Sequence, residues 1–348
     1  MSAANPALTT ARLTLGRRLS ALSGPVLGLL AVLTLFVLLI GFKGRPGDLG
    51  QFLSLPNLQV LVQEATIPAI VALGMLMVIV SGGIDLSVGS VLALVTVVTM
   101  QVYRHLYDGR PESMAMASLA AVGAGVLTGG VSGLVNGLLI TRLRVTPFVV
   151  TLGTLGVARG LAVWLAERKL LAFPRDGRPE WVDTLARVHA GWMVFNPGFW
   201  SLVALAVLSA VLLKYTVLGR YCYAIGSNEA TARLCGVGVE RTKVWIYTLA
   251  GLLTGWAGVL MFAHGGSGDP SGAEGMELRV IAAVVIGGAA LSGGQGTVVG
   301  TLLGVFILEI LGNGVSIFNV PVEVQHILIG VIIIANTALS RWQRRRPE

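Results

Sequence analysis

GGIDLSVGSVLAL, residues 82–94, separates two long apolar runs and decides how the chain around it folds. The run before it covers about residues 64–81, and the run after it covers about residues 86–104. Each approaches the about 20 mostly apolar residues that a helix needs to cross a bilayer. The two glycines favour a break in the chain, so Asp85 and Ser87 are expected where a new helix begins. The stretch therefore predicts a turn between two membrane-spanning helices.

Apolar runs of this kind recur along the whole chain and predict an all-α, polytopic membrane protein. Of the 348 residues, 54% are hydrophobic and only 12% are charged, whereas a soluble domain carries about 25% charged residues. The 46 glycines suit this class because small residues let helices approach closely in lipid. About ten transmembrane helices are expected, at about residues 25–42, 64–81, 86–104, 115–140, 146–166, 198–213, 244–263, 278–291, 297–315 and 321–340.

Basic residues are distributed unevenly between the two faces of such a bundle. The face that holds both termini would also hold the turn at 141–145 and the loop at 214–243, with most of the Lys and Arg residues. The positive-inside rule makes this face cytoplasmic. We therefore expect a cytoplasmic N-terminal segment at 1–24, a transmembrane domain at 25–340 and a cytoplasmic tail at 341–348.

Several function classes are disfavoured. The net charge of +8 comes without a basic stripe of interleaved aromatic residues, so we expect contacts with membrane lipid and no nucleic acid. The chain contains no GxxxxGK[ST] phosphate loop, no HExxH and no GxSxG motif. The two cysteines, Cys222 and Cys235, match no metal-ligand spacing and are expected to be free thiols. No catalytic residue, metal site or cofactor is therefore expected, and the chain is not expected to be an enzyme.

Two further stretches bear on the organisation of the chain. Residues 43–63 contain Pro46 and Pro56 and are expected to form a loop with a short interfacial helix. GGAALSGGQ at 287–295 shares five of nine positions with GGIDLSVGS at 82–90. Transporters often contain such repeats with broken helices, but low-complexity glycine segments also match by chance, so a structural repeat stays open.

Few polar side chains lie within the predicted spans, and they are the candidates for a translocation pathway. The candidates are Asp85, Ser87, Asn136, Thr151 and Asn313. For Asp85 and Ser87 two roles are open: a cap on the helix that begins there, or a contact with the substrate. For asparagine and threonine, hydrogen bonds between helices are the more common role. Arg159 and Glu309 have two pairings open, one with each other and one with other buried groups.

LGRYCYAIGSNEATARLCGVGVERTKVW, residues 218–245, is a polar loop with the pattern of a short helix. Ser227 or Asn228 can cap this helix at its start, Gly236 ends it, and Glu229 and Arg233 stand four apart between them. A helix this short is unstable alone. Two interpretations are therefore open: a docking surface for another protein, or an ordinary connector. The residues of this surface are Asn228, Glu229, Ala230, Arg233, Leu234 and Gly236.

With these motifs, the chain resembles the permease subunit of bacterial ABC importers for monosaccharides, of the ribose, xylose and galactose type. The resemblance runs in order from about Leu58 to Leu339 and is densest in the C-terminal half. The stretches that carry it are VIVSGGIDLSVGSVLAL (78–94), TPFVVTLGTLGVARGLA (146–162), GRYCYAIGSNEATARLCGVGVERTKVWIYTLAGLLTGWAGVL (219–260) and IAAVVIGGAALSGGQGTVVGTLLG (281–304).

This resemblance implies the ABC importer permease fold and a pore subunit in the bacterial cytoplasmic (inner) membrane that translocates a monosaccharide. It also implies three partners: cytoplasmic ABC ATPase subunits that hydrolyse ATP, an extracytoplasmic sugar-binding protein, and a second permease copy or a related permease. By the same resemblance, the helix at 226–236 couples the pore to the ATPase, although Gly236 lies one residue later than in the EAA signature of other importers. Nucleoside and branched-chain amino-acid permeases are also similar, and an ion-coupled carrier that acts without an ATPase is a less favoured alternative.

Overall fold

The computed structural model describes residues 6–45, 47–174, 177–186 and 194–318, together with residues 327 and 330. Over these ranges the protein is almost entirely helical, which confirms the all-α class. The helices are α1 (Pro6–Lys43), α2 (Asp48–Phe52), α3 (Leu55–Val80), α4 (Val88–Leu106), α5 (Pro111–Arg142), α6 (Pro147–Leu165), α7 (Glu180–Ala186), α8 (Pro197–Tyr215), α9 (Val217–Ser227), α10 (Glu229–Leu234), α11 (Val239–Gly265), α12 (Met276–Ile286) and α13 (Val298–Ile317). Two short strands, β1 (Leu171–Ala172) and β2 (Ser267–Gly268), pair antiparallel.

Seven helices among the described residues are long and apolar enough to cross a membrane. They are α1 over Gly24–Lys43, and α3, α5, α6, α8, α11 and α13 over their full lengths. The helix α4 nearly coincides with the expected span at 86–104, whereas the expected span at 321–340 lies outside the described residues. The chain is a polytopic membrane protein, as its hydropathy predicts.

The expectation of a loop over residues 43–63 was wrong in its second half, because α3 begins at Leu55. Ser54 caps this helix by accepting a hydrogen bond from the Asn57 backbone N–H at 3.3 Å. Pro56 lies in the first turn, where a missing N–H costs nothing because that group has no partner within the helix. A proline that indicated a loop therefore marks the start of a helix.

The expected span at 278–291 was also wrong, because it contains only the helix α12. With 11 residues, α12 is about 16 Å long and covers roughly half of the hydrocarbon core. Gly288 has a left-handed backbone (φ 92°) directly after it. The amide of Ala289 then bonds to the carbonyl of Val284 at 3.1 Å, which closes the helix end.

The helix α3 forms the centre of the bundle and packs against α8, α11, α12 and α13. Most of its side chains are buried, which fits a helix that is apolar on every side. The largest interhelical contact joins α5 and α11. A methyl group at Gly129 or Gly133 on α5 would overlap the α11 backbone, so these two helices pack backbone to backbone.

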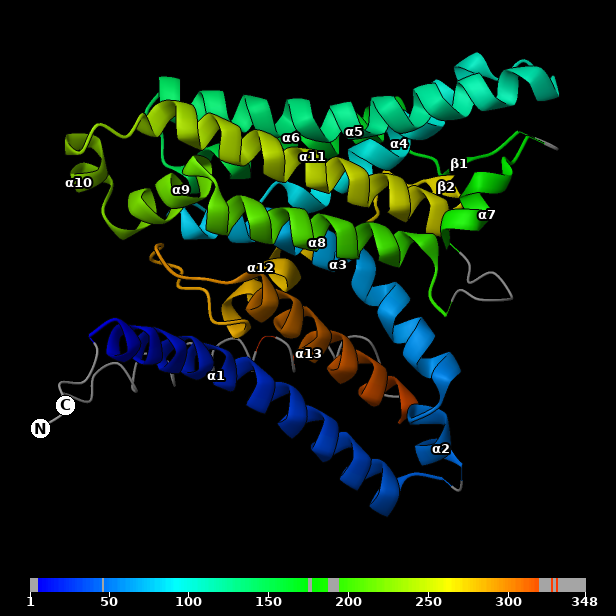
Figure 1. The fold of residues 1–348 in the computed structure, drawn as a ribbon. Helices are drawn as coiled ribbons and strands as arrows, with labels where there is room; N and C mark the ends of the chain where they lie inside the picture. The colour runs from blue at the N-terminus through cyan, green and yellow to red at the C-terminus, as the bar shows by residue number, and fades with distance from the viewer. Residues whose placement is uncertain are drawn as a thin grey trace, which may run out of the picture.

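The successive spans alternate in direction, so the connecting segments gather at two opposite ends (Figure 1). The helices α9 and α10 and the start of α1 lie at one end, which we call the α10 end. The strands β1 and β2 and the helices α2 and α7 lie at the other, which we call the strand end. The turn between α5 and α6 and the segment from α8 to α11 therefore share the α10 end, as the alternation of spans in the sequence predicts.

Two breaks in the helical structure meet inside the molecule. The break after α3 covers 81–87, the break after α12 covers 287–297, and the Gly294 amide of the second bonds to the Val80 carbonyl at 2.8 Å. Both helices end with a left-handed glycine, Gly82 and Gly288. Gly82 is the first glycine of GGIDLSVGS, whereas Gly288 is the second glycine of GGAALSGGQ. The left-handed glycines therefore do not align, and the two breaks do not correspond residue by residue. An internal repeat remains a prediction.

Candidate functional site

The helix α10 is the short helix that the sequence predicts at the polar loop. Asn228 is extended (φ −163°, ψ 103°), and its Oδ1 accepts a hydrogen bond from the Thr231 backbone N–H at 2.9 Å. At the other end, Gly236 adopts a left-handed backbone (φ 82°), and the Val237 amide bonds to the Ala232 carbonyl at 3.1 Å. These are the N-cap and C-terminal glycine motifs by which a helix satisfies its free backbone groups.

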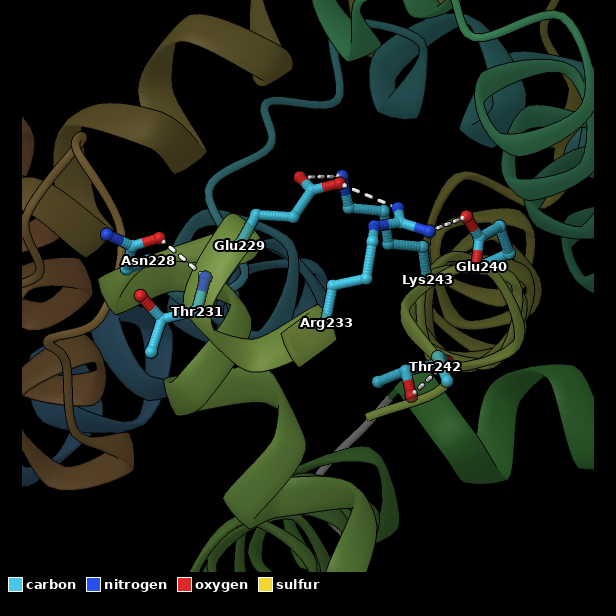
Figure 2. A network of polar contacts seen from close by, with 8 residues as sticks. Asn228, Glu229, Thr231, Arg233, Glu240, Thr242 and Lys243 are labelled. Carbon is cyan, nitrogen blue, oxygen red and sulfur yellow. Dashed lines mark hydrogen bonds and ion pairs between the residues drawn. The ribbon is translucent and has the colours of Figure 1, made fainter. Parts of the chain in front are cut away.

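An ion network ties α10 to the start of α11 (Figure 2). Arg233 contacts Glu229 at 3.4 Å and Glu240 at 2.5 Å, and the Lys243 Nζ contacts Glu229 at 2.7 Å. Glu240 and then Glu229 raise the pKa of the Arg233 guanidinium above its already high ordinary value. Arg233 therefore carries its charge at every physiological pH. Exposed ion pairs are each worth about 0.2–1 kcal/mol, so the network orients α10 more than it stabilises it.

The surface of α10 that faces away from the protein is largely uncovered. Leu234 is 89% exposed and Ala230 is exposed as well. Only Ala232 points inward, where it packs with Ile225 and Val239. A six-residue helix with one buried side chain has little reason to fold alone, and an exposed leucine next to a charge network is suited to a protein partner.

The neighbouring helix α9 connects α10 to the centre of the bundle. Its Cys222 Sγ bonds to the Met77 carbonyl on α3 at 3.2 Å, and its Tyr223 hydroxyl donates to the Gly296 carbonyl at 2.8 Å. At its end, a side chain on Gly226 would overlap both the Val80 carbonyl and the Gly294 amide. These contacts place the end of α9 against both helix breaks, so a displacement of α10 has a direct route to them.

A cleft of about 550 Å³ lies between α10, the start of α11 and the turn from α5 to α6. The charged residues that line it are Arg144, Glu229, Arg233, Glu240 and Lys243. Three cations and two anions face one another across it, which gives a polar recess at the α10 end. Its composition suits a polar group of a macromolecular partner better than an apolar ligand.

Four of the five proposed pathway residues form one buried polar cluster. Asp85 Oδ1 accepts hydrogen bonds from the backbone N–H (2.8 Å) and the hydroxyl (2.6 Å) of Ser87. Asn136 donates to the Ser87 Oγ at 3.0 Å and accepts from Thr154 at 2.6 Å. Thr151 donates to the Ile84 carbonyl at 3.2 Å. The cluster therefore joins α5 and α6 to the break before α4.

Asp85 accepts two hydrogen bonds from Ser87, within the turn that precedes α4, and α4 has no side-chain cap at its N-terminus, so the expected cap is not formed. The hollow beside Asp85 is about 10 Å³, close to the volume that holds one water molecule. A monosaccharide does not fit there in this conformation. A substrate contact by these residues remains a prediction.

The fifth pathway candidate and the two isolated charges have other partners. Asn313 and Asn57 exchange hydrogen bonds between their side-chain amides at 2.9 and 3.0 Å. Glu309 pairs with Arg279 at 2.7 Å, and Arg159 donates to the carbonyls of Pro270 and Gly272. Arg159 and Glu309 thus pair with other groups and not with each other. The sequence interpretation missed Arg279 and Gly226, since neither stands out without its neighbours in space.

Comparison with known proteins shows the family to which the chain belongs. A family model described as "Branched-chain amino acid transport system / permease component" matches residues 57–337. The ribose import permease protein RbsC of Bacillus subtilis (strain 168) is 36% identical over 326 residues, which cover 91% of this chain and 92% of the relative. RbsC of Escherichia coli (strain K12) is 36% identical over 284 residues, or 81% of this chain and 85% of the relative.

The likeness extends beyond ribose permeases. The L-arabinose ABC transporter permease protein AraH of Azospirillum brasilense is 32% identical over 310 residues, which cover 89% of this chain and 87% of the relative. No solved structure matches this chain.

Proposed function

We propose that this chain is the membrane-spanning subunit of an ABC importer for a monosaccharide. The premise is that it belongs to the family of branched-chain amino acid transport system permease components. The single structural observation that carries this proposal is α10. It is a capped helix with an exposed leucine, it is held against α11 by side-chain ion pairs, and it is joined through α9 to two helix breaks. The names of its relatives, ribose and L-arabinose import permeases, support the sugar as cargo.

The mechanism that we propose uses these contacts. ATP binding closes a pair of ATPase subunits in the cytoplasm, and the closure displaces the two docked α10 helices. Through Gly226, each displacement reaches the breaks after α3 and α12 and tips the pore between its inward- and outward-facing states. The chain needs only a weak sugar site, because a soluble binding protein supplies the affinity.

The proposal includes three partners and an orientation. The residues Asn228, Glu229, Ala230, Arg233, Leu234 and Gly236 dock on the ATPase. A second permease copy or a related permease completes the pore, and an extracytoplasmic sugar-binding protein docks at the strand end. The α10 end then faces the cytoplasm of a bacterial inner membrane, with both termini on that side, and ATP hydrolysis takes place in the partner.

Reversal of the Arg233 charge tests the coupling role. In Arg233→Glu three carboxylates face one another around α10, so we expect loss of ATPase association and of sugar uptake, while the protein still inserts in the membrane. Co-purification with the ATPase and uptake in proteoliposomes measure both effects. Arg104→Glu, the same charge change on an exposed residue at the strand end, is the matched control. Normal association together with normal uptake in Arg233→Glu would rule out this role of α10.

A branched-chain amino acid is the second candidate cargo, because the matching family model bears that description. Competition by unlabelled ribose, arabinose and leucine against uptake in the reconstituted complex separates the two candidates. Gradient-driven uptake by the chain without any ATPase would instead favour an ion-coupled carrier.

A further inference from the structure

One face of α6 is uncovered although it combines glycines with a charged and an aromatic residue. Gly153, Gly156 and Gly160 are exposed, and no atom lies within 4 Å of the position where a side chain would begin. Trp164, one turn beyond Gly160, is 74% exposed. A cleft of about 620 Å³ opens on this face and is lined by Arg159, Gly160, Val163, Trp164, Glu167 and Arg168.

Arg159 indicates that the cleft at the Trp164 end of this face is polar. Its Nη1 donates to the carbonyls of Pro270 at 2.8 Å and Gly272 at 3.0 Å. The adjacent Asp269 amide bonds to the hydroxyl of Thr96, at the middle of α4, so Arg159 is held within the membrane and does not extend to its surface. Ionisable side chains at such depth face a protein interior or a water-filled cavity. The cleft that Arg159 also lines, at the Trp164 end of α6, is therefore a polar recess that water can fill.

We infer that this face of α6 lines the sugar pathway, and that Trp164 and Arg159 contact the sugar at its outer entrance. This inference rests on the proposed function, in which a second permease copy closes the other side of the recess. The cleft is open, and among the described residues it is lined only by α6 and the turn after it, so the second copy is needed to complete it. Its volume is within the about 300–1,000 Å³ typical of small-molecule sites. The hollow beside Asp85, at about 10 Å³, does not.

The chemistry of the two side chains suits a neutral monosaccharide. A pyranose or furanose ring has a patch of C–H groups that stacks on the apolar face of an indole, and a rim of hydroxyls. Arg159 has five N–H donors, and among the described residues only those on Nη1 have partners. The donors on Nη2 and Nε remain for sugar hydroxyls. Gly160 and Gly156, one and two helical turns before Trp164, leave space for the sugar to pass along α6.

Replacement of the indole tests the contact. In proteoliposomes with the ATPase and the binding protein, we expect Trp164→Ala to lower uptake about tenfold, which corresponds to about 1.4 kcal/mol. Trp164→Phe keeps an aromatic face and should retain most of the uptake. The matched control is Trp200→Ala, an indole that is 50% exposed near the same end of α8. ATPase association should stay normal in all three variants. Equal uptake in Trp164→Ala and Trp200→Ala would overturn the inference.

A second measurement does not depend on transport or on a stable Trp164 variant. A membrane-impermeant thiol reagent, applied from the extracytoplasmic side, should modify Gly160→Cys but not Ala204→Cys, an exposed small residue at similar depth on α8. Reactivity at position 160 no higher than at position 204 would overturn the inference. Failure of the unaltered chain to associate with any ATPase would instead count against the proposed function, and the labelling result would still decide whether α6 borders water.

Discussion

Gly226 shows how a single small residue can connect two parts of the molecule. A side chain there would overlap the Val80 carbonyl at the end of α3 and the Gly294 amide in the second break. Its backbone conformation is ordinary, since it has no positive φ angle. The requirement for glycine is therefore one of space, which only the packed structure shows.

Gly226→Ala is expected to damage coupling and stability together. Overpacking of this kind costs about 1–3 kcal/mol, and the added methyl group would separate α9 from both breaks. We expect a lower thermal midpoint of the purified protein and reduced ATP-driven uptake.

The control is Gly238→Ala, twelve residues along, where no atom lies within 4 Å of the added methyl group. A Gly226→Ala protein with the melting temperature and uptake of Gly238→Ala would contradict the tight junction at α9.

At the scale of the element, α10 depends on its ends more than on its length. Six residues allow very few internal backbone hydrogen bonds, so the Asn228 cap and the Gly236 turn supply much of what defines the helix. The ion network then fixes its direction relative to α11. Removal of the cap should therefore act on docking before it acts on the fold of the bundle.

Asn228→Ala is expected to cost about 1 kcal/mol, roughly a fivefold change in the population of the ordered helix. We expect a correspondingly weaker affinity for the ATPase, measured by titration in detergent, with little change in the melting temperature. Asn228→Asp preserves an acceptor for the Thr231 N–H and should restore most of the affinity. Weakening by Asn228→Asp equal to that by Asn228→Ala would argue against the cap as the cause.

For the whole molecule, the alternating spans fix which segments share an end, and the distribution of charge predicts the side of the membrane on which that end lies. The turn between α5 and α6 and the segment from α8 to α11, both at the α10 end, contain the basic residues Arg142, Arg144, Lys214, Arg220 and Lys243. The positive-inside rule favours this end as the cytoplasmic one, which is the orientation that we propose.

Reporter fusions test this orientation. A phosphatase that folds only outside the cytoplasm should be active when fused after Asp108, in the connection between α4 and α5, and inactive when fused after Val145, between α5 and α6. A fluorescent protein should show the opposite pattern. The reverse result for both reporters would place the α10 end outside and would remove the ATPase as its partner.

Much of the architecture could be predicted from local sequence because its causes are local. Apolar runs long enough to cross a membrane identify most spans, and Gly236 marks the end of α10, whose start the sequence left open between Ser227 and the observed cap, Asn228. The errors also have local explanations. Pro56 suits a first helical turn as well as a loop, and the two glycines after Ile286 end α12 at half the length of a span.

The partners of the polar residues could not be predicted in this way. Glu309 has Arg279 as its partner, and Asn313 has Asn57, 256 residues away. A sequence shows that a buried charge or amide needs a partner, but not which residue folding brings next to it.

By itself, the sequence determined that this is a polytopic helical membrane protein with a capped helix in a polar loop, because hydropathy, turns and caps act over short stretches of chain. Only the tertiary structure decided that Asp85 is enclosed in a polar cluster, that α9 touches two helix breaks, and that one face of α6 lies open beside an intramembrane arginine. These features depend on contacts between segments far apart in the chain, where close packing selects one arrangement among many that the local pattern allows.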